Sequence, residues 1–246
     1  MQQISICGLK IHNVDMKEAV QACLDLAGRA GAVYTPNAEM ADLALRQPKF
    51  LELLNGGDLI VPDGAGVVLA SKLKRVPLKG KVAGIELAQN LLAPAQERGL
   101  RLFLFGSKPG VAERAAEKMK EQYPLLEICG TANGYFSDES GPVSAICAAK
   151  PDVVFVCLGS PKQERFIHAH KQECNALMLG LGGTLDVIAG DVKRAPDFYV
   201  KHNLEWLYRG ALDPKRWGRL MRIPAFLVKV LFQKEHGRNG RVKTKE

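Results

Sequence analysis

The sequence lacks several features that would assign it to a class at once. None of its six cysteines forms a CxxC pair, and no run approaches the ~20 apolar residues of a membrane span. The N-terminus has no basic segment leading into a long apolar core, so no signal peptide is expected. The scattered cysteines favour a reducing compartment over a disulfide framework, and their spacing indicates no zinc site. We therefore expect a cytoplasmic protein.

Motifs of several large enzyme classes are also absent. The sequence has no GxGxxG after its first expected strand, no GxxxxGK[ST] phosphate loop and no GxSxG nucleophile motif. No DxD pair is present to hold a divalent metal against a diphosphate. His168 and His170 form the only close histidine pair, and two residues apart on a helix they point to different faces. Dehydrogenase, P-loop and hydrolase functions are disfavoured, and no metal or cofactor is expected.

What is present is ordinary globular composition. The 246 residues are 47% hydrophobic and 24% charged, which excludes a disordered, collagen-like or coiled-coil chain. Strand patterns alternate with helical ones up to residue 190, which predicts an α/β fold with a Rossmann-like, mainly parallel sheet flanked by helices. Expected strands are 3–7, 32–35, 59–61, 101–105, 127–130, 153–158 and 176–179; expected helices are 15–30, 65–73, 85–97, 109–122, 138–149 and 162–170.

Charge is concentrated at the C-terminus. Residues 201–246 hold twelve Lys and Arg against four Asp and Glu, a net +8, whereas the first 200 residues hold 22 of each. We expect a core over 1–200, a basic helical appendage over 201–232 and a disordered tail over 233–246. Within 201–232, basic residues recur on one side of the expected helix and Trp217, Leu227 and Leu231 lie on the other. This pattern is typical of a helix at an anionic membrane surface, or of one packed on its own domain.

Five expected strand ends carry loops of Gly, Pro and small polar residues. In a parallel sheet these ends share one edge, where ligands bind, and such loops let backbone N–H groups approach an anion. We therefore expect a nucleotide or sugar-nucleotide site. The loops are 35–39, 62–66, 106–110, 159–164 and 180–184.

In order and spacing, these segments resemble the WecG/TagA/CpsF family of bacterial glycosyltransferases. The resemblance covers about residues 4 to 224. The matching stretches are TPNAE (35–39), PDG (62–64), FLFG (103–106), NGYF (133–136), LGSPKQE (158–164), GGTLDVIAG (182–190), VKRAP (192–196), LEWLYR (204–209) and DPKR (213–216).

The resemblance implies an inverting, metal-independent transfer of a sugar, typically N-acetylmannosamine, from its UDP-activated form. The implied acceptor is polyprenyl-diphosphate-linked GlcNAc at the inner face of the cell membrane. This step serves teichoic acid linkage-unit synthesis or a related surface polymer. Some members use glucose or a uronic acid for exopolysaccharide, so the donor stays open. Peripheral membrane association through the tail, and a possible homo-oligomer, also follow.

The resemblance assigns Asp63 as the catalytic base that deprotonates the acceptor hydroxyl. The alternative is that Asp63 caps the helix that begins near Ala65. Thr35 matches a second active-site position, although a strand-end Thr can also bond the local backbone.

Five further residues match substrate-binding positions of the family. Gln163 matches a position near the substrate, or is only an N-terminal helix residue. Lys81 stands where relatives often have Arg, so it keeps the charge but loses the bidentate geometry, and the alternative is a solvated loop lysine. Arg209, Arg216 and Arg219 match family arginines, of which at least one is expected to neutralise the UDP diphosphate.

Asn37 is the remaining candidate, and it either binds substrate or holds its turn. Two competing functions stay open. A non-catalytic nucleotide-binding protein would bind UDP without turnover. A nucleic-acid-binding protein would use the basic tail, but few aromatic residues accompany that charge, so no nucleic-acid partner is expected.

Overall fold

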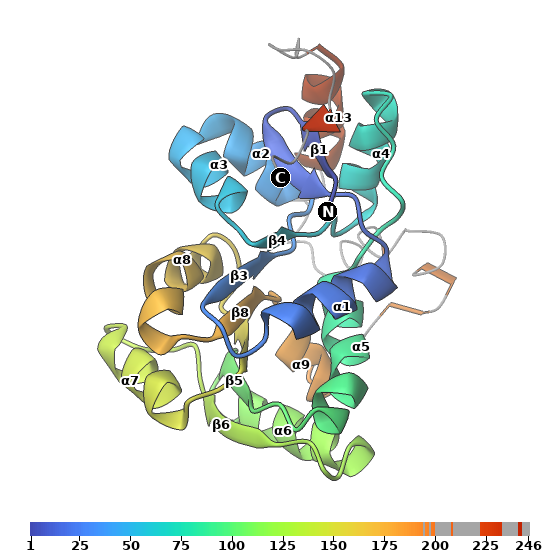
Figure 1. Ribbon diagram of the computed structural model, residues 1–246. Coiled ribbons are helices and arrows are strands. Elements are labelled where there is room, and N and C mark those ends of the chain that lie inside the picture. Colours follow the sequence, from blue (N-terminus) through green and yellow to red (C-terminus); the bar gives the residue numbers. More distant parts are fainter. Residues whose placement is uncertain (194, 197, 200–207, 209–221, 233–240, 243–246) are drawn as a thin grey trace.

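The centre of the protein is a six-stranded sheet in which every strand pair is parallel, with the strand order β4-β3-β8-β7-β5-β6 (Figure 1). The computed structural model describes residues 1–193, 195–196, 198–199, 208, 222–232 and 241–242. The predicted α/β class and parallel sheet are confirmed. The strands are β3 (Gly31–Tyr34), β4 (Leu59–Ile60), β5 (Leu102–Gly106), β6 (Ile128–Ala132), β7 (Val153–Cys157) and β8 (Leu177–Gly180).

Helices cover both faces of this sheet because alternate strand residues point to opposite sides. In β7, Val154 and Val156 join one apolar cluster and Val153 and Phe155 join the other. The first cluster includes α7 (Ser140–Ala149) and α8 (Lys162–Cys174). The second includes α1 (Met16–Leu26), α5 (Gly84–Glu97), α6 (Val111–Gln122) and α9 (Thr184–Ile188). Loops form the carboxyl edge of the sheet, between the two helical layers.

The N-terminal strand does not belong to the parallel sheet, contrary to the sequence-based expectation. β1 (Gln3–Ile6) forms an antiparallel hairpin with β2 (Leu9–His12), which was not predicted. Cys7 and Gly8 both have positive φ, as a two-residue hairpin turn requires. Because the turn has only two residues, the sequence of this hairpin resembles a single strand followed by a loop. His12 ties the hairpin to the sheet, since its Nδ1 accepts the Ile60 N–H at 3.0 Å.

A third strand, β9 (Arg241–Val242), pairs antiparallel with β1. This pairing involves two residues of the segment 233–246, and the expected division into core, appendage and disordered tail stays a prediction. Backbone pairing to an exposed strand edge does not need the apolar periodicity that the segment lacks. The other residues of 233–246 lie outside the described part of the chain.

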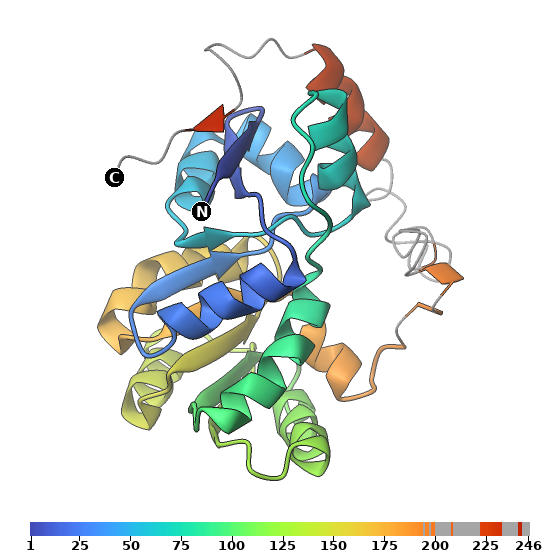
Figure 2. The same ribbon diagram turned by 45° about the vertical axis from the view of Figure 1, so that its right-hand side comes forward.

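Four helices pack together beyond β4: α2 (Ala38–Arg46), α3 (Pro48–Asn55), α4 (Ala65–Leu73) and α13 (Arg222–Phe232) (Figures 1 and 2). α13 is the described part of the predicted appendage. It lies against α2 and α4 and buries Phe226 and Val230. Lys229 forms an ion pair with Asp42 of α2, a carboxylate that is almost fully buried. The alternative of a helix packed on its own domain thus holds for this face of α13.

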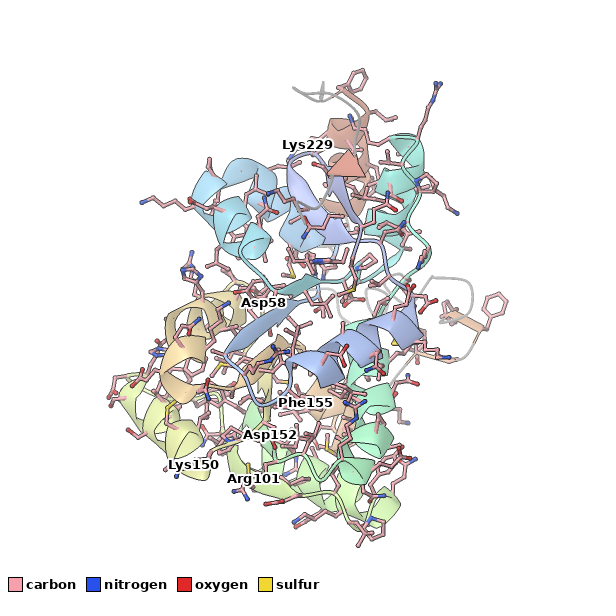
Figure 3. The ribbon with its side chains drawn as sticks, viewed as in Figure 1. Asp58, Arg101, Lys150, Asp152, Phe155 and Lys229 are labelled. Carbon is pink, nitrogen blue, oxygen red and sulfur yellow. A yellow bond between two sulfur atoms is a disulfide. The ribbon has the colours of Figure 1, made fainter. Side chains whose placement is uncertain are left out.

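Charged residues also brace the opposite, amino edge of the sheet (Figure 3). Asp58 accepts the Ala32 N–H at 2.9 Å and pairs with Lys171. Asp152 accepts the Arg101 N–H at 2.8 Å, and the Arg101 side chain donates to the Lys150 carbonyl. These groups join neighbouring strands to each other, so the amino edge is structural.

Cys147 and Cys174 form a disulfide, which corrects the expectation of unpaired thiols. The two cysteines lie 27 residues apart, at the C-terminal ends of α7 and α8, with a Cα–Cα distance of 4.5 Å. No local spacing signals such a pair, because packing of the two helices creates it. Among the described helices, none has the length and apolar character needed to cross a membrane.

Candidate functional site

Five of the predicted site residues lie along the carboxyl edge formed by β4, β3 and β8. Thr35 follows β3 directly and is buried, and its hydroxyl donates to the Gly180 carbonyl at the end of β8 at 2.8 Å. The Asp63 N–H donates to the Pro36 carbonyl at 3.1 Å, which holds the loop after β4 against the loop after β3. Thr35 and Asp63 therefore stand on adjacent, directly bonded loops.

Asp63 directly precedes α4. The N-cap of this helix is Gly64, which has no side chain that could cap it. Gly64 has a φ of +85°, which only glycine adopts readily. Asp63 is partly exposed at the edge. The N-cap position therefore belongs to Gly64, and both roles of the Asp63 side chain, catalytic base and bond to the helix, stay predictions.

Asn37 and Lys81 differ in what the structure says of them. Asn37 is the N-cap of α2, and its Oδ1 accepts the N–H groups of Glu39 and Met40, each at 3.0 Å. The turn-holding alternative is thus confirmed for its carbonyl oxygen. Lys81 is partly exposed and precedes Val82, whose N–H donates to the Pro62 carbonyl at 2.8 Å. That bond brings the Lys81 segment beside the Asp63 loop.

Gln163 occupies the first turn of α8 with its side chain 3% exposed. Its Oε1 accepts the Gly182 N–H at 2.9 Å, and its Nε2 donates to Oε1 of Glu164 at 2.8 Å. A Cβ on Gly180 would stand 3.0 Å from Nε2, so the close approach of the amide depends on glycine there. We call Thr35, Asp63, Gln163, Gly180 and Gly182 the Thr35 cluster.

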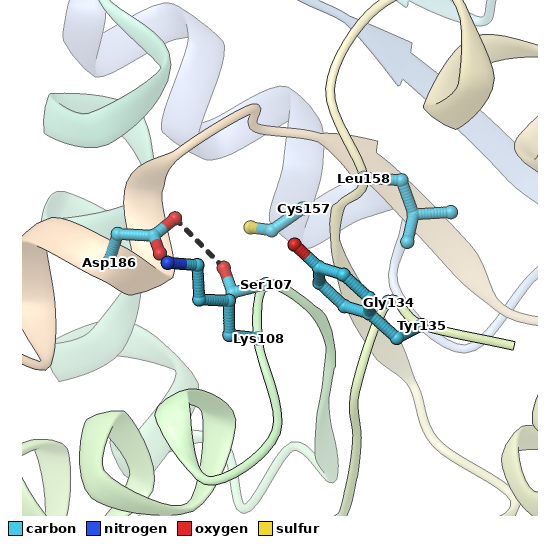
Figure 4. A pocket seen from close by; sticks show the side chains of 7 residues that line it. All are labelled: Ser107, Lys108, Gly134, Tyr135, Cys157, Leu158 and Asp186. Carbon is cyan, nitrogen blue, oxygen red and sulfur yellow. Dashed lines mark hydrogen bonds between the residues drawn. The ribbon is translucent and has the colours of Figure 1, made fainter.

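A cavity of about 220 Å³ opens farther along the same edge (Figure 4). It lies at the ends of β5, β6 and β7. Tyr135 is 67% exposed there, and the Ser107 hydroxyl donates to Asp186 Oδ2 at 2.9 Å. We call this cavity the Tyr135 pocket; its lining residues are Ser107, Lys108, Gly134, Tyr135, Cys157, Leu158 and Asp186.

The loop that carries Tyr135 is braced from both sides. The Gly134 N–H donates to the Ser107 carbonyl at 2.9 Å. Lys162 donates to the Gly134 carbonyl at 3.2 Å and stands 3.7 Å from the ring centroid of Phe136. Tyr135 itself projects from this braced loop, and its side chain is largely exposed.

Two buried ionisable groups border the site. Burial raises the pKa of Cys157 to about 12, so the thiol stays protonated and is not a nucleophile at neutral pH. Burial likewise raises the pKa of Glu164, against smaller opposing effects of the Gln163 and Ser160 side chains. Within the described residues, no group of three or more His, Cys, Asp or Glu is arranged to hold a metal ion.

Arg209, Arg216 and Arg219 lie outside the described residues, so their predicted contact with a diphosphate stays a prediction. Sequence reasoning missed Tyr135, Asp186 and Glu164. All three lie within stretches that carried the family resemblance, but nothing in their spacing distinguished them from their neighbours. The exposure of Tyr135, the hydrogen bond of Asp186 and the burial of Glu164 arise only in the folded protein, where the strand ends come together.

Comparison with known proteins identifies the family of the chain. Residues 4–240 match the model of the glycosyl transferase WecG/TagA/CpsF family. The chain belongs to this family. It is a glycosyltransferase, and the predicted resemblance is confirmed.

Three relatives carry the name N-acetylglucosaminyldiphosphoundecaprenol N-acetyl-beta-D-mannosaminyltransferase. The Bacillus spizizenii protein is 40% identical over 81% of this chain and 78% of its own length. The Bacillus subtilis protein is 39% identical over 85% and 82%, respectively. A Staphylococcus aureus protein is 35% identical over 93% of this chain and 92% of its own.

Proposed function

We propose that this glycosyltransferase moves N-acetylmannosamine from UDP-N-acetylmannosamine to polyprenyl-diphosphate-linked GlcNAc, as a step of teichoic acid linkage-unit synthesis. The observation that carries the proposal is the arrangement of one sheet edge. A nucleoside-sized pocket and a carboxylate beside a buried Thr and Gln lie along the same row of strand ends. The names of the relatives supply the sugar and the acceptor.

The Tyr135 pocket suits the nucleoside end of the donor. Its volume is below the roughly 300–1,000 Å³ of pockets that enclose a whole ligand, so it fits one part of a nucleotide-sugar. The exposed ring of Tyr135 offers a stacking surface, and Asp186 and Ser107 offer polar partners for a base or ribose. The sugar then extends along the edge toward the Thr35 cluster.

The transfer itself needs one base. Asp63 accepts the proton of the acceptor hydroxyl, whose oxygen attacks the anomeric carbon as the bond to UDP breaks. This displacement inverts the anomeric carbon and, from an α-linked donor, yields the β linkage in the relatives' name. Lys81, Lys108 and the arginines at 209, 216 and 219 are the candidates that neutralise the departing diphosphate, without a metal.

Association with the membrane is the second part of the proposal. The acceptor in the relatives' name is lipid-linked. α4 and α13 pack together and expose five large apolar side chains, on helices whose neighbouring sequence is basic. Such a surface suits peripheral binding to anionic lipid. These side chains are Leu69, Leu73, Val228, Leu231 and Phe232.

Purified protein, stripped of metal with EDTA, tests the activity. It is incubated with UDP-N-acetylmannosamine and a lipid-diphosphate-GlcNAc analogue, and UDP release and the mass of the product are followed. Transfer with a β configuration at the new linkage is expected. Turnover only with UDP-glucose or a uronic acid donor would change the sugar, and UDP binding without turnover would favour a nucleotide-binding protein.

Membrane association has a separate test. The full chain is sedimented with vesicles of anionic or neutral lipid, together with the double variant Leu231→Gln, Phe232→Gln. Binding to anionic vesicles that the variant weakens is expected. Equal binding by both proteins would contradict a role for the exposed face of α13. A homo-oligomer stays a prediction, which the sedimentation velocity of the same sample checks.

A further inference from the structure

Glu164 is a buried carboxyl group that the proposed mechanism does not use. It is 0% exposed, although it lies in the first turn of α8, where an exposed carboxylate would already stabilise the helix dipole. Burial therefore adds a desolvation cost that helix stability does not require. Its Oε2 is buried and makes no hydrogen bond of normal geometry among the residues that the structure describes, although the neighbouring Ser160 side chain lowers the pKa of this carboxyl.

The other oxygen, Oε1, accepts the hydrogen bond from Nε2 of Gln163 at 2.8 Å. The orientation of the Gln163 amide follows from its two neighbours. The Gly182 N–H is a donor, so the atom that faces it is Oε1 of Gln163, and the nitrogen must face Glu164. The Gly182 N–H and the Glu164 carboxyl together admit only this orientation of the amide.

Gln163 in turn lies against the end of β8. Its Nε2 approaches Gly180, whose carbonyl accepts the Thr35 hydroxyl. A rotation of the amide would break the Gly182 contact and change the group presented to the Thr35 cluster. The carboxyl of Glu164 is the side chain that opposes this rotation.

We propose that Glu164 is a positioning residue for the transfer reaction: its carboxyl group holds the Gln163 amide in one orientation, which leaves the second N–H of Nε2 for a substrate oxygen. The inference rests on the proposed function, since it assigns Gln163 to the substrate. Glu164 acts as an acceptor through Oε1, so a neutral group with the same oxygen can replace it.

Two variants of Glu164 test this. Glu164→Leu removes the acceptor and fills the space, and a misplaced Gln163 is expected to lower kcat by about tenfold or more. Glu164→Gln keeps an acceptor oxygen and is expected to restore most of the turnover. KM for the donor nucleotide changes little in either variant, because the Tyr135 pocket is untouched. Full turnover in Glu164→Leu, or equal loss in Glu164→Gln, would overturn the proposal.

A double variant shows whether Glu164 acts through Gln163. In a Gln163→Ala background, Glu164→Leu has nothing left to position, so the double variant is expected to match Gln163→Ala alone. Losses of the two single variants that multiply in the double variant would mean an independent role, and the proposal would fail.

A measurement without substrate separates this proposal from the proposed function and does not depend on a folded Leu variant. The side-chain amide protons of Gln163 in the wild-type protein are expected to exchange with water more slowly than those of Gln172, which is exposed on the same helix. Equal exchange rates would refute the positioning contact. Slow exchange in a protein that transfers no sugar would instead reject the proposed function and keep the contact.

Discussion

The two ends of the carboxyl edge are built on different principles. At the Thr35 cluster, the Thr35 and Gln163 side chains are buried and bonded to the backbone at Gly180 and Gly182. At the Tyr135 pocket, the loop backbone is braced but the Tyr135 ring is left exposed. Fixed side chains suit groups that must meet a reacting centre in one geometry, and exposed ones suit a ligand that enters and leaves. The comparison predicts losses of turnover at one end and losses of affinity at the other.

The largest effect is expected at Asp63. Asp63→Asn keeps the shape of the side chain but removes the base, so kcat should fall by about 10²- to 10⁴-fold. UDP affinity should be kept, since the Tyr135 pocket is intact. The rate of UDP release at saturating donor and the Kd of UDP by calorimetry measure the two quantities. Asp186→Asn is the matched control, and it should weaken UDP binding rather than lower kcat.

A smaller loss of turnover is expected at Thr35. Thr35→Val keeps the volume but leaves the Gly180 carbonyl without its donor, which costs about 1–3 kcal/mol of unfolding free energy. The displaced strand end should lower kcat by about tenfold. Thr35→Ser retains the hydroxyl and should retain activity. If Val and Ser behave alike in the transfer assay, the Thr35 hydroxyl is not needed.

At the other end, Tyr135→Ala should weaken donor binding. Loss of a stacking ring costs about 1–3 kcal/mol of binding free energy, or roughly tenfold or more in the Kd of UDP. At saturating donor, kcat should be unchanged. Leu125→Ala, which truncates another highly exposed side chain outside the pocket, is the control. A fall in kcat with unchanged KM would place Tyr135 in the chemistry and remove the contrast.

The smallest expected effect is a pH dependence of stability at His12, which anchors the N-terminal hairpin to β4. Burial, and secondarily the positive N-terminus, lowers the pKa of His12, whose Nδ1 must stay unprotonated to accept the Ile60 N–H. Below the ordinary pKa of 6.5 the unfolded chain binds a proton that the folded one refuses, so stability falls as the pH falls. The loss is at most about 1.4 kcal/mol per pH unit.

In melting curves recorded below pH 6.5, the stability of His12→Gln should no longer fall as the pH falls. His168→Gln, which changes an exposed histidine, should keep the pH dependence of the wild type. Equal slopes for wild type and His12→Gln would mean that the hairpin does not hold β4 through this histidine.

The repeating parts of the fold could be predicted from the sequence. The expected helix 65–73 coincides with α4, and β5, β7 and β8 lie within a residue or two of the expected strands. Long apolar runs and amphipathic periods specify such elements locally. Sequence patterns did not predict the β1–β2 hairpin, α2 or α3. These elements are short, and their apolar residues are buried only when they pack with α4 and α13 in the folded protein.

The candidate site divides in the same way. Thr35, Asp63 and Gln163 were selected because the resemblance marks their loops. The structure brings those loops together, and the roles of the three residues stay predictions. Glu164 was missed because its partner is the adjacent Gln163 and only burial makes the pair informative. The disulfide was missed for a related reason, since helix packing alone brings Cys147 to Cys174.

The most direct test of the account measures kcat at saturating donor and the Kd of UDP for Asp63→Asn and Tyr135→Ala side by side. The account predicts opposite signatures: turnover lost with affinity kept in the first variant, and affinity lost with turnover kept in the second. If both variants lose the same quantity, or Asp63→Asn turns over at the wild-type rate, the division of the edge into a reacting end and a holding end is wrong.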